Sequence, residues 1–112
     1  MQLEKFVSFV SYATSILFTA IGIPLALKMV PPNSAYGVRI DQTLSSTEAW
    51  YSINTNTGIA LIIAGIVSLF LIYLINNRLS LNPNTALVLI LALPITLVIT
   101  AFAITIAFYT LI

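Results

Sequence analysis

The segment Val30–Gly58, VPPNSAYGVRIDQTLSSTEAWYSINTNTG, is the only sizeable polar stretch in a chain of 112 residues. It contains the charged residues Arg39, Asp41 and Glu48 and the only tryptophan, Trp50. The sequence on either side is apolar and almost free of charge. This contrast predicts that the flanking segments lie in lipid and that the polar segment joins them outside it.

The overall composition supports a membrane protein. Hydrophobic residues make up 60% of the chain and charged residues 6%, against about 25% charged residues in an ordinary soluble domain. The net charge is +1 and no basic patch is present, so we expect no nucleic-acid partner. Cysteine and histidine are absent, which removes thiol chemistry, zinc clusters and imidazole catalysis. We therefore expect no enzyme, no catalytic residues, no metal site and no cofactor.

Three uncharged runs are long enough to cross a bilayer. A helix needs about 20 apolar residues to span the hydrocarbon core, and Phe6–Leu27 has 22 without a charge. This run is longer than the apolar core of a signal peptide and ends in no small-residue cleavage site, so we do not expect its removal. The runs Gly58–Ile75 and Ala86–Ile112 follow. The sequence predicts one all-α membrane domain over 1–112, with transmembrane helices at about 6–29, 58–76 and 85–111.

Small and hydroxylated residues recur at helical spacing in each run. In a membrane such a face usually packs against another helix, because small residues permit close approach. The face of the first helix could instead line a polar path. We expect the second helix to be the partner of the first. The three faces consist of Ser8, Ser11, Ser15, Thr19 and Gly22; of Ala60, Ala64 and Ser68 beside Gly65; and of Thr96, Thr100 and Ala103 or Ala107.

The termini should lie on opposite sides of the membrane, because the chain crosses it three times. Lys5 and Arg78 fall on one side and Lys28 and Arg39 on the other. The positive-inside rule therefore gives no orientation. We expect Pro94, inside the third run, to kink that helix.

The polar loop, residues 30–57, has two parts with different local signals. Prolines fix the backbone and Gly37 permits positive φ, so Pro31-Pro32 to Gly37 should form a rigid turn. Ser45 and Glu48 fit a capping box at the start of a helix. This helix would run from about 46 to 76, or about 46 Å, beyond the hydrocarbon core of about 30 Å. Trp50 would then lie at headgroup level as an interfacial anchor.

The order of residues in this loop resembles the SdpI (YfhL) family of bacterial integral membrane proteins, in a short three-helix form. The family pattern is a V-P-P-N turn, an aromatic-Gly-x-Arg, a T-L-S segment, an acid and a Trp, and Asn-x-x-x-Gly entering a helix. Ile40-Asp41 stands where the family more often has Thr-Pro. The resemblance implies a three-helix membrane domain and a relation to an immunity protein against a secreted, membrane-active peptide toxin. The matching positions are Pro31, Pro32, Asn33, Tyr36, Gly37, Arg39, Thr43, Leu44, Trp50, Asn54 and Gly58.

Six loop residues are the candidate binding residues, namely Asn33, Tyr36, Arg39, Glu48, Trp50 and Asn54. Four of them, Arg39, Glu48, Trp50 and Asn54, have an architectural alternative. Arg39 could grip a phosphate or a carboxylate, or it could cap helix carbonyls or pair with Asp41 or Glu48. Glu48 could act only as a cap, and Asn54 could bond the backbone of the loop.

The favoured function is binding, immunity or sensing of a membrane-active peptide through this loop, by a multi-pass protein of the bacterial cell membrane. We expect the lipid bilayer, a peptide toxin or another membrane protein, and further copies of the chain as partners. A small oligomeric channel or transporter, or a structural subunit of a membrane complex, is the alternative. A lipid-directed enzyme with Asp41 and Glu48 as acid and base is the least favoured hypothesis.

Overall fold

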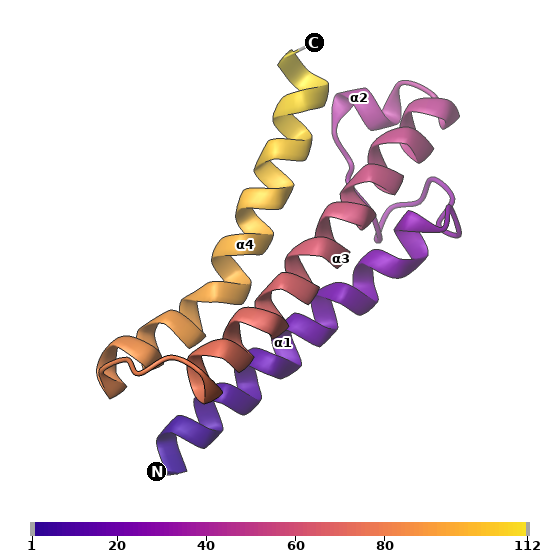
Figure 1. The fold of residues 1–112 in the computed structure, drawn as a ribbon. Helices are drawn as coiled ribbons and strands as arrows, with labels where there is room; N and C mark the ends of the chain where they lie inside the picture. Colours follow the sequence, from indigo (N-terminus) through magenta and orange to yellow (C-terminus); the bar gives the residue numbers. More distant parts are fainter. Residues whose placement is uncertain (1, 112) are drawn as a thin grey trace.

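The computed structural model describes residues 2–111, which form four helices and no strand. They are α1 (Gln2–Ala26), α2 (Asp41–Leu44), α3 (Thr47–Asn77) and α4 (Pro83–Leu111) (Figure 1). The helices α1, α3 and α4 are each long and apolar enough to cross a membrane. The predicted all-α fold with three transmembrane helices is thus confirmed.

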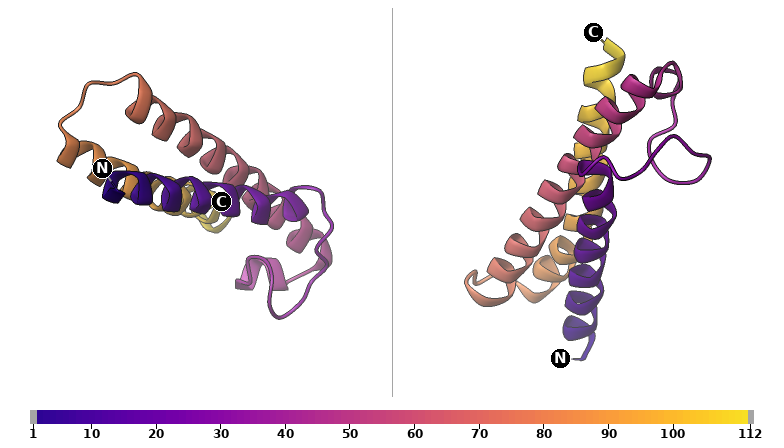
Figure 2. Two further views of the ribbon diagram at one scale, coloured as in Figure 1. Left: turned by 90° about the horizontal axis from the view of Figure 1, so that it is seen from below. Right: turned by 90° about the vertical axis from the view of Figure 1, so that its right-hand side faces the viewer.

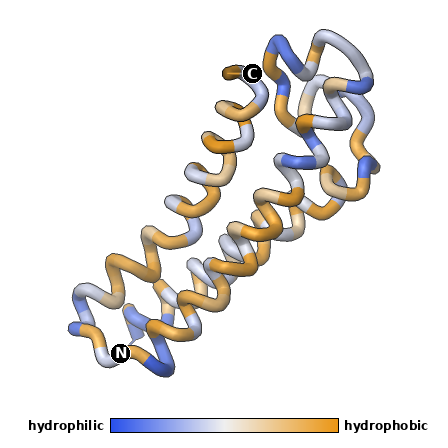
Figure 3. The backbone as a smooth tube through the Cα atoms, turned by 45° about the horizontal axis from the view of Figure 1, so that its top comes forward, coloured by the Kyte–Doolittle hydropathy of each residue, from blue (hydrophilic) through white to orange (hydrophobic). Residues whose placement is uncertain are grey.

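The bundle is longer than the hydrocarbon core of a bilayer. Its principal extents are 51, 26 and 19 Å, against a core of about 30 Å. Polar residues gather at its two ends and apolar residues fill the middle (Figure 3). The N- and C-terminal ends of the chain lie at opposite ends of the bundle (Figure 1), as three crossings require.

The helices α1 and α3 pack against each other through small residues, as predicted. Ser11, Ser15 and Gly22 of α1 are buried, and so are Ala64, Gly65 and Ser68 of α3. A Cβ added at Gly58 would lie 2.5 Å from the backbone nitrogen of Ala26 and 2.6 Å from the backbone oxygen of Gly22. The two backbones approach so closely that only glycine fits there.

The small face predicted for α4 is not the face that this helix buries within the chain. Its buried residues are Ile90, Pro94 and Val98, whereas Thr96, Thr100 and Ala103 are exposed. Because α4 is apolar on all sides, its sequence pattern does not single out the face that meets α3. The helix changes direction near its middle, where Pro94 lies (Figure 1).

The observed helix ends differ from the expected ones in three places. The first helix spans Gln2–Ala26 instead of 6–29, because a turn at 27–28 stops it before the prolines. The loop expected over 30–57 includes the short helix α2 and the first turns of α3. As predicted, α3 is continuous from the polar lead-in through the membrane span.

The cap of α3 also lies one residue later than predicted. Ser46, not Ser45, is the N-cap, and its Oγ accepts from the Ala49 amide at 3.0 Å. The Ser45 hydroxyl instead donates to the Gln42 carbonyl at 2.7 Å. With Ser46 as the cap, Ala49 takes the third helical position, so Glu48 cannot close the reciprocal bond of a capping box.

Candidate functional site

The first half of the polar loop is a turn built around Asn33. Its Oδ1 accepts from the amides of Ala35 and Tyr36 at 2.8 and 2.7 Å. Its Nδ2 donates to the carbonyls of Pro31 and Tyr36 at 2.7 and 2.9 Å. One side chain therefore satisfies four backbone groups that have no regular secondary structure to pair them.

Tyr36 attaches this turn to α1. Its phenol donates a hydrogen bond to the backbone carbonyl of Ile21, and its ring packs on the core around Leu25 and Leu61. Burial raises the pKa of the Tyr36 phenol above its usual value. The phenol therefore stays protonated and remains a donor throughout the physiological pH range.

Trp50 is buried beneath the loop and is hydrogen-bonded to it. Its side chain is 0% exposed, and its Nε1 donates to the Val30 carbonyl at 2.9 Å. The prediction of an interfacial anchor is therefore wrong. The ring is covered by the loop itself, which folds back over the first turns of α3.

Asn54 forms hydrogen bonds with both backbone polar groups of Val38 in the loop. Its Oδ1 accepts from the Val38 amide at 2.6 Å, and its Nδ2 donates to the Val38 carbonyl at 3.3 Å and to the Trp50 carbonyl at 3.0 Å. Gly37 just before has φ +118°, and a Cβ there would lie 2.9 Å from both Asn54 and Trp50. Asn54 therefore bonds the loop backbone, which is the architectural alternative given for it above.

The second half of the loop has its own local support. The Thr43 hydroxyl, which is buried, accepts from the Ile40 amide and donates to the Ile40 carbonyl, each at 2.9 Å. These bonds close the single turn of α2. In Figure 2, right, the segment between α1 and α3 stands out to one side of both helices.

The charged residues of the loop point away from these internal bonds. Arg39, Asp41 and Glu48 are all exposed. Within residues 2–111, the Arg39 side chain has neither a hydrogen bond nor an ion pair. The alternative in which Arg39 caps helix carbonyls or pairs with an acid is therefore absent from the structure. Of the six candidate binding residues, four are turned inward, and Arg39 and Glu48 remain available to another molecule.

A further charged residue, Lys28, occupies an unusual backbone position. It follows α1 with φ 59°, in the left-handed region. The amide of Lys28 bonds the Leu25 carbonyl at 3.2 Å, and that of Met29 bonds the Pro24 carbonyl at 2.9 Å. These two bonds form a Schellman motif, in which the left-handed position is most often a glycine. A lysine here costs backbone strain of about 1 kcal/mol.

Lys28 contributes to a polar hollow of about 380 Å³ between the end of α1 and the first turns of α3. Glu48, Ser52, Thr55 and Asn56 also line it. The Thr55 hydroxyl oxygen is buried and has no hydrogen-bond partner within the described chain. Nor does an ion pair join Lys28 to Glu48 there.

Sequence reasoning singled out Glu48 of this hollow but missed its other lining residues. Lys28 was assigned only to the flank of a span. The available signal was the absence of a glycine between Leu25 and the proline pair, where a helix end commonly has one. The polar residues Ser52, Thr55 and Asn56 stand at helical spacing on one face of α3, but nothing in the sequence shows what that face meets.

These features define a multi-pass, helical membrane protein with a cross-bonded loop between its first two spans. The family model of the SdpI/YfhL protein family matches residues 28–108, and the chain belongs to this family. No curated protein and no solved structure matches the chain.

Proposed function

We propose that this protein binds a membrane-active peptide at the loop end of the bundle, as an immunity or sensing protein of the bacterial cell membrane. The polar hollow, lined by Lys28 and Glu48, is the proposed binding surface, together with the exposed Arg39 of the same loop. The observation that carries the proposal is Lys28 itself. A lysine in a strained position where glycine is favoured is best explained by a use for its charge.

The chemistry of the hollow suits a peptide that carries both a negatively and a positively charged group. Lys28 offers an ammonium group to a carboxylate, and Glu48 offers a carboxylate to an amine or guanidinium group. The Thr55 hydroxyl, unpaired among the described residues, adds a group that a peptide backbone can satisfy. We propose a binding protein rather than an enzyme, because these groups supply recognition and no nucleophile–base pair.

One argument for the channel alternative, the hydroxyl stripe of the first helix, no longer supports it. It relied on the hydroxyl stripe of the first helix as the lining of a polar path. Ser11 and Ser15 of that stripe are buried against α3, so the stripe serves packing within one chain. We keep the homo-oligomer as a proposal, since the exposed Thr96, Thr100 and Ala103 leave a small face of α4 for another copy.

The substitution Lys28→Gly tests the proposal most sharply, because it separates stability from binding. It relieves the strain of the left-handed position and should raise the free energy of unfolding by about 1 kcal/mol. It also removes the charge, and it should therefore weaken the protection of expressing cells against membrane-active peptides. Growth inhibition in a peptide dilution series and detergent unfolding measure the two effects.

The matched control is Arg78→Gln, which removes an exposed cation at the opposite end of the bundle. Protection should be unchanged in this control and reduced in Glu48→Gln and Arg39→Gln. Full protection by Lys28→Gly, Glu48→Gln and Arg39→Gln at normal protein levels would refute the proposed binding surface.

A further inference from the structure

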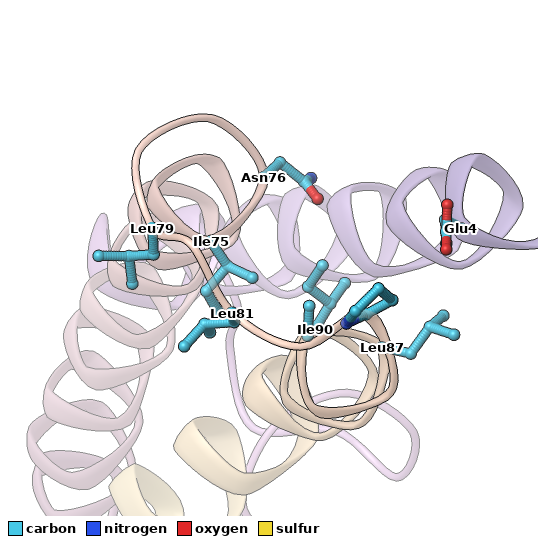
Figure 4. A pocket seen from close by; sticks show the side chains of 9 residues that line it. Glu4, Ile75, Asn76, Leu79, Leu81, Leu87 and Ile90 are labelled. Atoms are coloured by element: carbon cyan, nitrogen blue, oxygen red, sulfur yellow. The ribbon is translucent and has the colours of Figure 1, made fainter. Parts of the chain in front are cut away.

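A second hollow lies at the other end of the bundle, far from the loop. It has a volume of about 250 Å³ and is enclosed by the start of α1, the end of α3 and the start of α4 (Figure 4). Its walls are mainly apolar and include Leu79, Leu81, Leu87 and Ile90. Glu4 and Asn76 are the two polar side chains in its lining.

An adjoining hollow of about 530 Å³ shares Glu4 and Asn76 with the first. It continues over Lys5 and Ser8. The Asn76 amide donates to the Ser8 hydroxyl at 3.1 Å, which joins α3 to α1 between the two hollows. A carboxylate, an ammonium group and a fixed amide thus lie beside an apolar cavity.

The position of this surface indicates the kind of molecule that reaches it. Lys5 and Arg78 flank the spans at this end, which corresponds to the level of the lipid headgroups. A ligand that matches the surface needs a cation with N–H donors for Glu4, an anion for Lys5 and a hydrocarbon part for the apolar walls. A phospholipid with a primary ammonium headgroup has all three.

We propose that the two adjoining hollows bind phosphatidylethanolamine. Its ammonium group donates to the Glu4 carboxylate, its phosphate lies against the Lys5 ammonium, and one acyl chain enters the cavity lined by Leu87 and Ile90. The bound lipid fills the space between α1 and the turn that joins α3 to α4, and it fixes the relative position of these helices.

This site is separate from the proposed peptide site, and its α1 residues lie outside the matched family region, whereas its α3 and α4 residues lie within it. Glu4, Lys5 and Ser8 precede residue 28, where the family match begins. The inference therefore does not depend on the proposed function and can fail without it.

The headgroup preference of the full chain tests the proposal. The purified protein is titrated in detergent with phosphatidylethanolamine or phosphatidylcholine of identical acyl chains, and bound lipid is counted by native mass spectrometry. The quaternary ammonium group of choline has no N–H to donate to Glu4. Because hydrogen bonds to charged groups are among the strong ones, phosphatidylethanolamine should bind about tenfold more tightly.

Two substitutions assign the preference to the site. Glu4→Gln should reduce the tenfold preference to about twofold or less, whereas Asp41→Asn, which removes an exposed carboxylate at the other end, should preserve it. Lys5→Gln should weaken both lipids by the same factor, because both carry the phosphate. Equal binding of the two lipids by the unmodified chain, a preference that survives Glu4→Gln, or an affinity unchanged by Lys5→Gln would overturn the proposal.

Discussion

The two ends of this helical bundle are held together in different ways. At the loop end, Asn33, Tyr36, Trp50 and Asn54 bond the backbone of the connecting segment to itself and to the helices. At the opposite end, a short turn joins α3 to α4, and the exposed Ser8–Asn76 pair links α1 to α3. The polar bonds of the described chain are thus concentrated where the charged residues of the loop must be held in place.

The difference has a physical origin in the length of the connections. A short turn between adjacent helices has few backbone groups that need partners, whereas the segment from α1 to α3 has many. Side chains that satisfy those groups also fix the conformation of the segment. The comparison predicts that substitutions at the loop end are costly and that equivalent substitutions at the other end are not.

The largest effect is expected for Gly58→Ala, where α1 and α3 cross near the loop. The added Cβ meets backbone atoms of Gly22 and Ala26, which cannot turn aside as a side chain can. The free energy of unfolding should fall by about 3 kcal/mol, measured by circular dichroism during titration with a denaturing detergent. The control Leu91→Ile, at an exposed position of α4, should change it by less than about 0.5 kcal/mol. Equal stability of the two variants would contradict the close crossing.

The next largest effect is expected for Asn54→Ala. The buried Val38 amide loses its acceptor, and an unsatisfied buried donor costs about 2 kcal/mol. The matched control is Asn76→Ala, which removes an exposed amide at the other end and should cost about 0.5 kcal/mol or less. The same unfolding titration compares them. Similar losses for both amides would show that the two ends do not differ as proposed.

A smaller effect is expected for Tyr36→Phe, which removes the hydrogen bond to Ile21 and keeps the ring. The loss should be about 1 kcal/mol at neutral pH. Since the pKa of Tyr36 is raised on folding, this stabilisation is complete below the unfolded pKa of about 10 and is lost as pH rises through the folded value. The difference between the two proteins should therefore narrow above pH of about 10, and a constant difference would contradict the role of the phenol.

The sequence was sufficient for the fold because its main signals were long and redundant. Uncharged runs predict the three spans, and small residues at helical spacing predict the α1–α3 contact. The face of α4 could not be predicted, because a helix that is apolar on all sides carries no directional pattern. Here the kink region at Pro94 packs inward, and the threonines face away.

The candidate site was only partly predictable for a related reason. Residue type indicated that Trp50 and Asn54 matter, but it did not indicate whether they point toward the loop or toward a ligand. That depends on how the segment folds back over α3, which is a tertiary property. Lys28 was overlooked because its strain is a backbone property that exists only in the folded chain.

Amide hydrogen exchange at Val38 tests the central claim most directly, namely that inward motif side chains fix the loop and so hold its charges in place. The Val38 amide lies in the loop, outside any helix, yet it is bonded to Asn54 Oδ1 at 2.6 Å. We predict that it exchanges as slowly as amides in the middle of α3 and that Asn54→Ala abolishes this protection while the α3 amides stay protected. Exchange of the Val38 amide at the rate of an unstructured loop in the unmodified protein would contradict the account.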